Sequence, residues 1–209
     1  MTSRFEETIV TRERLRQIYR PPGRFVANKA IDHIDQICRS FIAACPFVLV
    51  ATRGADGRFD LSPKGDPPGF VMVLDDKTLV IPDRLGNNRI DTLENLVVHP
   101  EVGLYFLIPG HDFTLRVSGT GQIVRDSVLL EQMSIKGRQP SSLLVVNVEE
   151  AFQHCAKSIT RSGLWQPARW PDRSGVAGLA EAMVVHGALT ESVSKIQAVI
   201  DQDAVERLY

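Results

Sequence analysis

The stretch IPDRLGNNRID, from Ile81 to Asp91, contains the residue types that hold a small anion. It follows a strand-like run and precedes a helical pattern, so that Asn87 or Asn88 is placed to cap the helix. The first amide N–H groups of a helix are unpaired and attract negative charge, and Arg89 in the first turn can form two parallel bonds to a phosphate. The spacing therefore suits a phosphate site. A capped helix start with two solvated arginines is the open alternative, because turns rich in Asn and Gly are common.

A second polar segment, LSPKGDPPGF from Leu61 to Phe70, lies between two strand-like runs. Its prolines stiffen a loop whose backbone groups cannot all join a sheet. Ser62, Lys64 and Asp66 are the polar side chains of this loop. We interpret it as a rigid wall that presents amides and Lys64 to a flat polar ligand, or alternatively as a rigid hairpin insert.

A third polar segment, HCAKSITRSGLW, follows the last strand-like run. His154, Lys157 and Arg161 are spaced by three and four residues, which would stack them on one face of a helix. Ser162 and Trp165 come next, so the segment suits an anion that is joined to an aromatic ring system. A solvated helix face is the alternative that remains open.

The elements that must position these segments are mostly strands. β-Branched and aromatic runs are separated by Gly and Asp turns, with hairpin-length connections and few helices between them. We therefore predict a mainly β fold, a β-barrel with helical additions, in which about six antiparallel strands close or nearly close. The predicted strands lie within residues 47–53, 59–62, 69–74, 78–81, 101–108, 114–124 and 143–148.

Helical patterns flank and interrupt the strands. They are predicted over Thr11–Tyr19, from Asn28 through Phe41 to a stop at Pro46, over Asp91–Val98, over Ser127–Ile135 and over Thr190–Leu208. We predict three regions: an N-terminal helical segment (1–46) that packs on the barrel, the barrel itself (47–165), and a C-terminal loop and helix (166–209).

Composition limits the class of protein. The chain has 209 residues, 44% hydrophobic and 23% charged, with a formal net charge of -1. That charge argues against a nucleic-acid-binding surface, and no apolar run is long enough to span a bilayer. Cys38, Cys45 and Cys155 do not have metal-ligand spacing, and the N-terminus lacks the apolar stretch of a signal peptide. We therefore expect reduced thiols, no cysteine metal site and a cytoplasmic protein.

Long motifs between Phe47 and Trp165 resemble the pyridoxamine 5′-phosphate oxidase-like FMN-binding split-barrel family. The matching stretches are FVLVATR, LSPKGDPPGFV, TLVIPDRLGNNRIDTLENLVVHPEVGLYFLIPG, FTLRVSG and VVNVEEAFQHCAKSITRSGLW. More narrowly, the chain is similar to a bacterial FMN-dependent branch marked by SPxGDPPGF, IPDRxGNNR and HCxKxxxRSxLW. The resemblance implies a six-stranded antiparallel split barrel and a homodimer with FMN at the subunit interface.

The resemblance also assigns roles to individual residues. It implies that Asn88 and Arg89 hold the FMN phosphate and that Asp83 and Arg84 lie beside the flavin. Ser62 and Lys64 match the strand along the isoalloxazine edge. The second anion-binding and ring-covering segment, which reaches FMN from the partner subunit, corresponds to Lys157, Arg161, Ser162 and Trp165.

The function that the resemblance implies is an FMN-dependent oxidoreductase with hydride transfer at flavin N5. Such chemistry requires no protein acid or base, and we assign no catalytic residue; the loop histidines His99 and His111 are interpreted as structural or solvated. The Trp- and Arg-rich C-terminal substrate segment of pyridoxamine-phosphate oxidases is not found, so we expect a different small substrate. The alternatives are a flavin-binding or flavin-sensing module without turnover, or a barrel that binds deazaflavin or haem.

Overall fold

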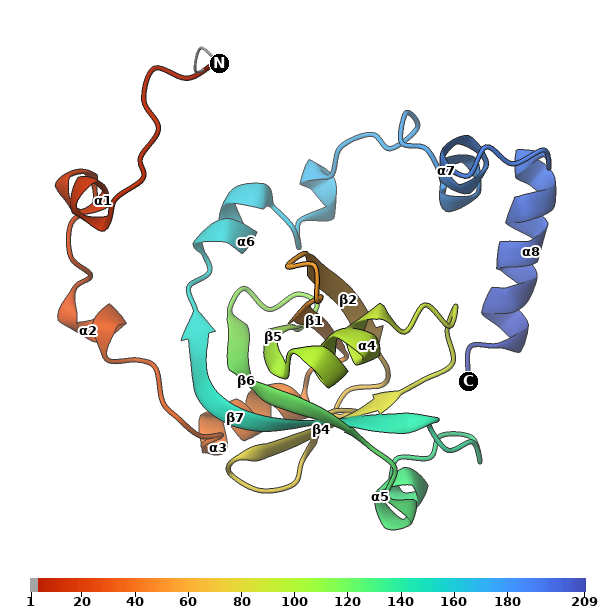
Figure 1. Cartoon of the computed structure of the whole chain (residues 1–209), viewed down its shortest axis with the longest axis horizontal. Coiled ribbons are helices and arrows are strands. Elements are labelled where there is room, and N and C mark those ends of the chain that lie inside the picture. Colours follow the sequence, from red (N-terminus) through yellow and green to blue (C-terminus); the bar gives the residue numbers. More distant parts are fainter. Residues whose placement is uncertain (1–3) are drawn as a thin grey trace. The chain divides into compact units, whose positions relative to one another are not determined.

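The computed structural model describes residues 4–209 and divides the chain into two compact units, Met1–Ala30 and Ile31–Tyr209 (Figure 1). The smaller unit contains two short helices, α1 (Arg12–Ile18) and α2 (Arg24–Ala27). The larger unit contains the sheet and the remaining helices.

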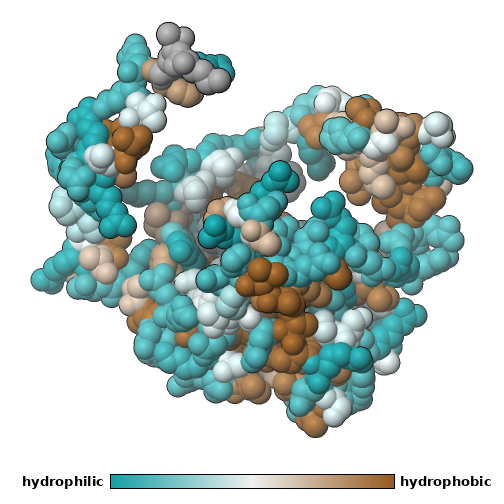
Figure 2. Space-filling model, viewed as in Figure 1, coloured by the Kyte–Doolittle hydropathy of each residue, from teal (hydrophilic) through white to brown (hydrophobic). Residues whose placement is uncertain are grey.

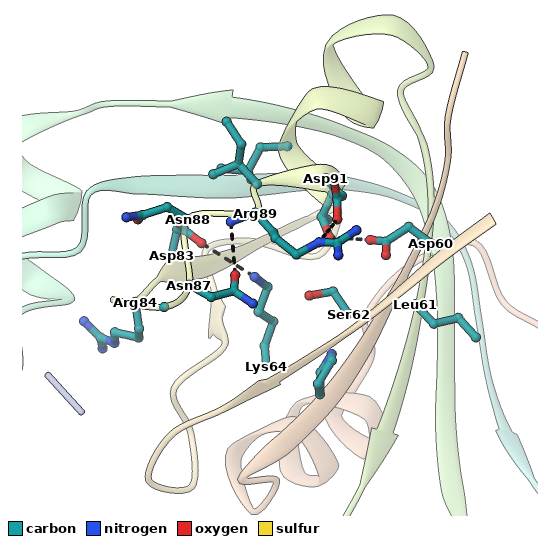
Figure 3. Close-up of a pocket in the computed structure, with 15 residues that line it drawn as sticks. Asp60, Leu61, Ser62, Lys64, Asp83, Arg84, Asn87, Asn88, Arg89 and Asp91 are labelled. Atoms are coloured by element: carbon teal, nitrogen blue, oxygen red, sulfur yellow. Dashed lines mark hydrogen bonds and ion pairs between the residues drawn. The ribbon is translucent and has the colours of Figure 1, made fainter. Parts of the chain in front are cut away.

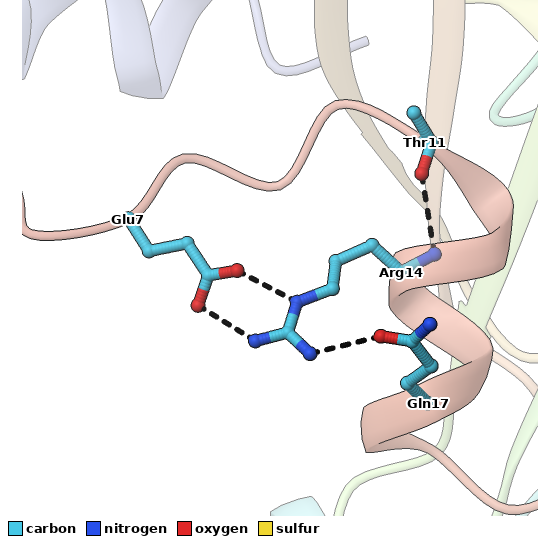
Figure 4. Close-up of polar contacts among 4 residues, drawn as sticks. All are labelled: Glu7, Thr11, Arg14 and Gln17. Atoms are coloured by element: carbon cyan, nitrogen blue, oxygen red, sulfur yellow. Dashed lines mark hydrogen bonds and ion pairs between the residues drawn. The ribbon is translucent and has the colours of Figure 1, made fainter.

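The smaller unit is ordered by polar contacts rather than by a core. The hydroxyl of Thr11 caps α1 by accepting from the amide of Arg14 at 3.2 Å. The Arg14 guanidinium donates to both carboxylate oxygens of Glu7, at 2.6 and 3.0 Å, and to Gln17 at 2.9 Å (Figure 4). This pair lowers the pKa of Glu7 and raises that of Arg14. The predicted helix over Thr11–Tyr19 is confirmed.

The larger unit is built on one seven-stranded antiparallel sheet, in the order β2-β1-β5-β6-β7-β4-β3. Its strands are β1 (Phe47–Arg53), β2 (Phe59–Gly65), β3 (Met72–Val73), β4 (Thr78–Asp83), β5 (Glu101–Leu107), β6 (Thr114–Val124) and β7 (Ser142–His154). The antiparallel sheet is confirmed, but the count of six strands is wrong. With its helices included, the chain is mixed α/β rather than mainly β. Among the described residues no ladder joins β2 to β3, so the predicted closure is not seen as backbone pairing.

The sheet encloses the main hydrophobic core. Alternate residues of β1 and β5 are buried, and Val48, Val50, Leu104 and Phe106 are almost fully removed from solvent. The longest ladder, β6 with β7, bends at a β-bulge beside Gly119. A Cβ atom at Gly119 would lie 1.9 Å from a backbone oxygen, so only glycine allows this close approach of the two strands.

The predicted helix from Asn28 to Phe41 is wrong in its first half. Asn28 ends α2, and α3 (Gln36–Ala43) begins only after Asp35, whose carboxylate accepts from the amide of Cys38 at 2.8 Å. Ile31 instead exchanges backbone hydrogen bonds with Ala151 on β7, and the Ile34 amide donates to the carbonyl of Asp76. The isoleucine spacing therefore resembles a helical period, but it belongs to a non-helical segment that contacts β7 and the turn before β4.

Helix α4 (Asp91–Val98) has the predicted bounds, whereas α5 (Ser127–Gln132) and α8 (Val193–Glu206) are shorter than predicted. Three further elements follow β7: α6 (Lys157–Ser162), a 3₁₀ turn (Pro167–Arg169) and α7 (Leu179–His186). Helix α7, which the sequence did not predict, contacts α8. None of the helices within residues 4–209 is long and apolar enough to cross a membrane.

Candidate functional site

The first two polar segments meet in a groove between β2 and the start of α4. Its cavity is about 220 Å3 and adjoins a space of about 330 Å3 that shares Lys64, Arg84 and Gly86 with it. Figure 3 shows side chains from β2, from the end of β4 and from the following loop pointing toward one another. Six residues assigned from the resemblance line this groove: Ser62, Lys64, Asp83, Arg84, Asn88 and Arg89.

One wall of the groove comes from the alternation of β2. Asp60, Ser62 and Lys64 are half-buried on one face of the strand, while the residues between them are exposed. These three residues pair with Thr52, Val50 and Val48 of β1, which are all buried. The polar wall therefore continues the core face of the sheet, and the edge position of β2 opens it to solvent.

The second wall is the loop that leads into α4. The side-chain oxygen of Asn87 accepts from the amide of Arg89 at 3.0 Å, so Asn87 shapes the loop and does not cap the helix. The N-cap residue is Ile90, which has no capping side chain, and the predicted cap at Asn87 or Asn88 is wrong. Both Asn88 and Ile90 have positive φ, 58° and 23°. Such a conformation is a genuine outlier for a β-branched residue and is typical of functional loops.

The cations of the groove are held by carboxylates. Arg89 donates to Asp91 at 2.8 Å, which raises the pKa of the arginine, and its side chain remains 77% exposed. Lys64 lies 3.6 Å from Asp83. With Asp60 and Arg84, the groove contains three cations and three carboxylates. It is therefore not a simple positive patch but a set of charges in fixed positions.

Arg84 lines the groove, and its guanidinium is also bound on the side of Asp66. Its Nε donates to Asp66 at 2.6 Å and its Nη1 donates to the carbonyl of Met133 at 2.7 Å. The Asp66 side chain is only 1% exposed, and its second oxygen accepts from the hydroxyl of Tyr209 at 3.0 Å. Arg84 thus borders the groove, while its guanidinium is bound within a buried network.

The third polar segment lies apart from the groove, whose lining includes none of Lys157, Arg161, Ser162 and Trp165. His154 is the last residue of β7, so the predicted helical face of His154, Lys157 and Arg161 is wrong. The contacts of α6 are local or structural. The hydroxyl of Ser162 donates to Ile159, and the indole of Trp165 donates to the carbonyl of His111 at 2.9 Å.

Two residues of the groove were missed by the sequence analysis. The hydroxyl of Thr92 donates to the carboxylate of Asp60 at 2.7 Å, which joins α4 to β2 across the groove. In the sequence, Asp60 could have been found from the alternation of the strand, which places it on the same face as Ser62 and Lys64. The partner of Asp60 on α4 could not be read from sequence because the contact spans 32 residues.

No group of His, Cys, Asp and Glu side chains that could bind a metal occurs within residues 4–209. Burial and the nearby carboxylate of Asp35 raise the pKa of the Cys38 thiol to about 12, and burial also raises that of Cys45. Both thiols are buried and protonated at neutral pH.

Comparison with known proteins gives one family match. The model of the pyridoxamine 5′-phosphate oxidase family matches residues 34–155. Among curated proteins none matches this chain.

Several solved structures are similar to the chain. HupZ from Group A Streptococcus is 22% identical, with a TM-score of 0.47 over 58% of this chain and 99% of that one. A candidate pyridoxamine 5′-phosphate oxidase from Lactobacillus delbrueckii is 23% identical, with a TM-score of 0.47 over 59% and 98%. HutZ, described as the haem storage protein of Vibrio cholerae, is 15% identical, with a TM-score of 0.40 over 58% and 94%.

Proposed function

The chain belongs to the pyridoxamine 5′-phosphate oxidase family, and from this premise we propose that it is an FMN-dependent oxidoreductase acting on a small molecule. Within the family we assign it to the bacterial FMN-dependent branch, on the motifs SPKGDPPGF and IPDRLGNNR. One observation carries the proposal: both motifs supply side chains to the same groove, at a helix start.

The residues present fit the phosphate end of FMN. The guanidinium of Arg89, the hydroxyl of Ser62 and the first amides of α4 are donors at one end of the groove. Arg89 is exposed, and within residues 4–209 its guanidinium donates through Nε to Asp91, so its terminal N–H groups can bind a phosphate. A single terminal phosphate suits this set of donors, because the chain has no Gly-rich fingerprint for the pyrophosphate of FAD.

The adjoining space along β2 fits a flat ring. Lys64 and the half-buried Phe70 line it, and the rigid backbone around Pro63 and Pro82 forms part of its wall. In our proposal Lys64 donates to the polar edge of the ring, and Asp83 holds the lysine in position. When it is bound there, FMN supplies hydride exchange at its N5 atom with the substrate. The protein binds and orients the cofactor, and no acid or base of its own is assigned.

We propose that the chain forms a homodimer that completes the site. β2 is an edge strand whose outward side chains include Phe59 (80% exposed) and Leu61 (67%), and α4 exposes Val97 (80%) and Val98. Figure 2 shows a hydrophobic patch over α4. Exposed apolar surface beside a polar groove is typical of an interface, and a two-fold pairing would bury it in both copies. On the family resemblance, we propose that the α6 segment of one copy reaches the groove of the other.

A cytoplasmic location is part of the proposal. It is supported by Cys38 and Cys45, whose buried thiols form no disulfide, since such thiols persist in a reducing compartment.

The absorption spectrum of the protein purified without added cofactor tests the proposal. Flavin bands, together with FMN identified by chromatography of the released cofactor, would support it. A Soret band would favour haem, and released FAD or deazaflavin would contradict the phosphate site. Bound FMN that no electron donor reduces would favour a flavin-binding module without turnover.

A further inference from the structure

Residues 207–209, which we call the tail segment, contact the loop that leads into α4 and the neighbouring residue Asp66. A guanidinium N–H of Arg207 donates to the carbonyl of Gly86 at 3.2 Å. The hydroxyl of Tyr209 donates to Asp66 at 3.0 Å. These contacts join positions more than 100 residues apart in the chain, so they are a product of the tertiary fold.

The contact with Asp66 is built into a chain of buried polar groups. One oxygen of Asp66 accepts from Tyr209 and the other from Arg84, and Arg84 continues to the carbonyl of Met133. The Asp66 side chain is almost completely buried, and leaving one of its oxygens without a donor is costly. The hydrogen bond to Asp66 and burial raise the pKa of the Tyr209 hydroxyl, which stays protonated as a donor at neutral pH.

Two cations fix the ring and backbone of Tyr209. The ammonium of Lys136 lies 4.7 Å from the centroid of the Tyr209 ring, and Arg138 donates to the backbone oxygen of Tyr209. Tyr209 also lines a cavity of about 140 Å3 together with Asp83, Arg84 and Leu85. Tyr209 therefore lies beside Leu85 at the start of the loop, across this cavity.

The loop needs such support. Residues 85–90 are all exposed, and Asn88 and Ile90 adopt positive φ. Backbone outliers of this kind persist only where surrounding contacts hold them. At Gly86 no atom would touch an added Cβ within 4 Å, so side-chain packing does not hold this point of the loop. The hydrogen bond from Arg207 to its carbonyl does.

We propose that Tyr209 and Arg207 are positioning residues for the cofactor site. They act through Arg84 and Gly86, and they hold the loop of residues 85–90 in the conformation that places Arg89 and the start of α4 at the groove. This inference rests on the proposed function for the identity of the ligand. The support of the loop by the tail segment does not depend on it.

The test compares the full chain with Tyr209→Phe, Arg207→Ala and Arg207→Lys. Hydrogen exchange without FMN should show the hydrogen-bonded amides of the loop and of the first turn of α4 (Arg89, Leu93 and Glu94) exchanging about threefold to tenfold faster in Tyr209→Phe and Arg207→Ala, as expected for one lost hydrogen bond. Amides of β5 and β6 should keep their protection. The FMN dissociation constant should rise by a similar factor at a temperature where all variants are folded, and Arg207→Lys, which keeps a donor, should recover most of the affinity.

Gln202→Ala is the matched control, because it removes a contact to Glu206 that lies within α8 alone. Unchanged exchange of the loop in Tyr209→Phe and Arg207→Ala would overturn the inference. Tighter FMN binding by these variants would also overturn it, because the tail segment would then compete with the ligand. Faster loop exchange in a protein that binds no FMN at all would contradict the proposed function and leave the support of the loop intact.

Discussion

The groove and the α6 segment have similar polar composition but different structures. Both combine basic side chains with a short helix, and the family resemblance assigns both to the FMN site, α6 as its second anion-binding segment. In the groove, β2, the loop after β4 and α4 come from distant parts of the sequence and face one another. In α6, Lys157 and Arg161 are exposed on a six-residue helix that ends at Gly163.

The difference lies in what fixes the charges. In the groove each cation has a carboxylate partner, and Asp60 is joined to Thr92 across the groove. The side-chain bonds of the α6 segment lie within it, from Ser162 to Ile159, or join it to the loop after β5, from Trp165 to His111. A basic helix face with these contacts alone is a solvated surface. Only a second surface that covers it would make it part of a site, and in our proposal that surface belongs to another copy of the chain.

Among variants of the groove and of the α6 segment, Arg89→Ala is expected to change the FMN dissociation constant most. Loss of a guanidinium that binds a dianion in a partly enclosed site should raise the FMN dissociation constant by about 30-fold or more. Titration of apoprotein followed by flavin fluorescence measures this constant. Arg58→Ala is a matched control, since Arg58 is also an exposed arginine paired with an aspartate two residues away, and it lies outside the groove. Equal affinities of the two variants would show that Arg89 is only a solvated helix start.

A smaller effect is expected for the double variant Lys157→Ala/Arg161→Ala. If α6 reaches the groove of the partner copy, FMN should bind about tenfold more weakly, as expected for two partly exposed charges. Mixing this variant with Arg89→Ala decides between sites within one chain and sites between chains. A shared site predicts that each mixed dimer recovers one site of full affinity. No recovery in mixed dimers that are shown to form would place α6 at the groove of its own chain, and unchanged affinity of the double variant would remove α6 from the cofactor site.

The sequence predicted the fold and the groove to different degrees. Strand runs with alternating burial and the helix at Asp91–Val98 were readable, because local periodicity determines them. The helix predicted over 31–34 is wrong because Ile31 pairs with β7 and the Ile34 amide donates to Asp76, which are contacts of high sequence separation. The motif residues on β2 and in the loop were found, but not the ion pairs that occupy Lys64, Arg84 and Arg89. Those pairs depend on which segments the tertiary fold brings together, and local sequence patterns do not contain that information.

Asp91→Asn tests whether the carboxylates of the groove help or oppose the ligand. Asp91 is the partner of Arg89 and lies in the first turn of α4, where a phosphate would compete with it. Removal of this like charge should tighten FMN binding by about threefold, while α4 loses a small dipole contribution of about 0.3–1 kcal/mol. Isothermal titration of the variant and of Asp56→Asn, the equivalent partner of Arg58, measures the change. Weaker binding would mean that Asp91 positions Arg89 for the ligand.

The smallest effect on the cofactor is expected for Trp165→Phe, although the family resemblance places Trp165 over the flavin. The indole N–H donates to the carbonyl of His111, and the loss of one such bond should lower the free energy of unfolding by about 0.5–1.5 kcal/mol. Since phenylalanine keeps an aromatic ring, FMN affinity should stay the same whether the ring covers the flavin or not.

Trp165→Ala completes the test, because it removes the ring as well as the bond. If Trp165→Ala binds FMN as tightly as Trp165→Phe at a temperature where both are folded, Trp165 holds the α6 segment to the sheet and does not contact the cofactor. Weaker binding by Trp165→Ala alone would place the ring on the flavin and, with recovery in mixed dimers, on the flavin of the partner copy.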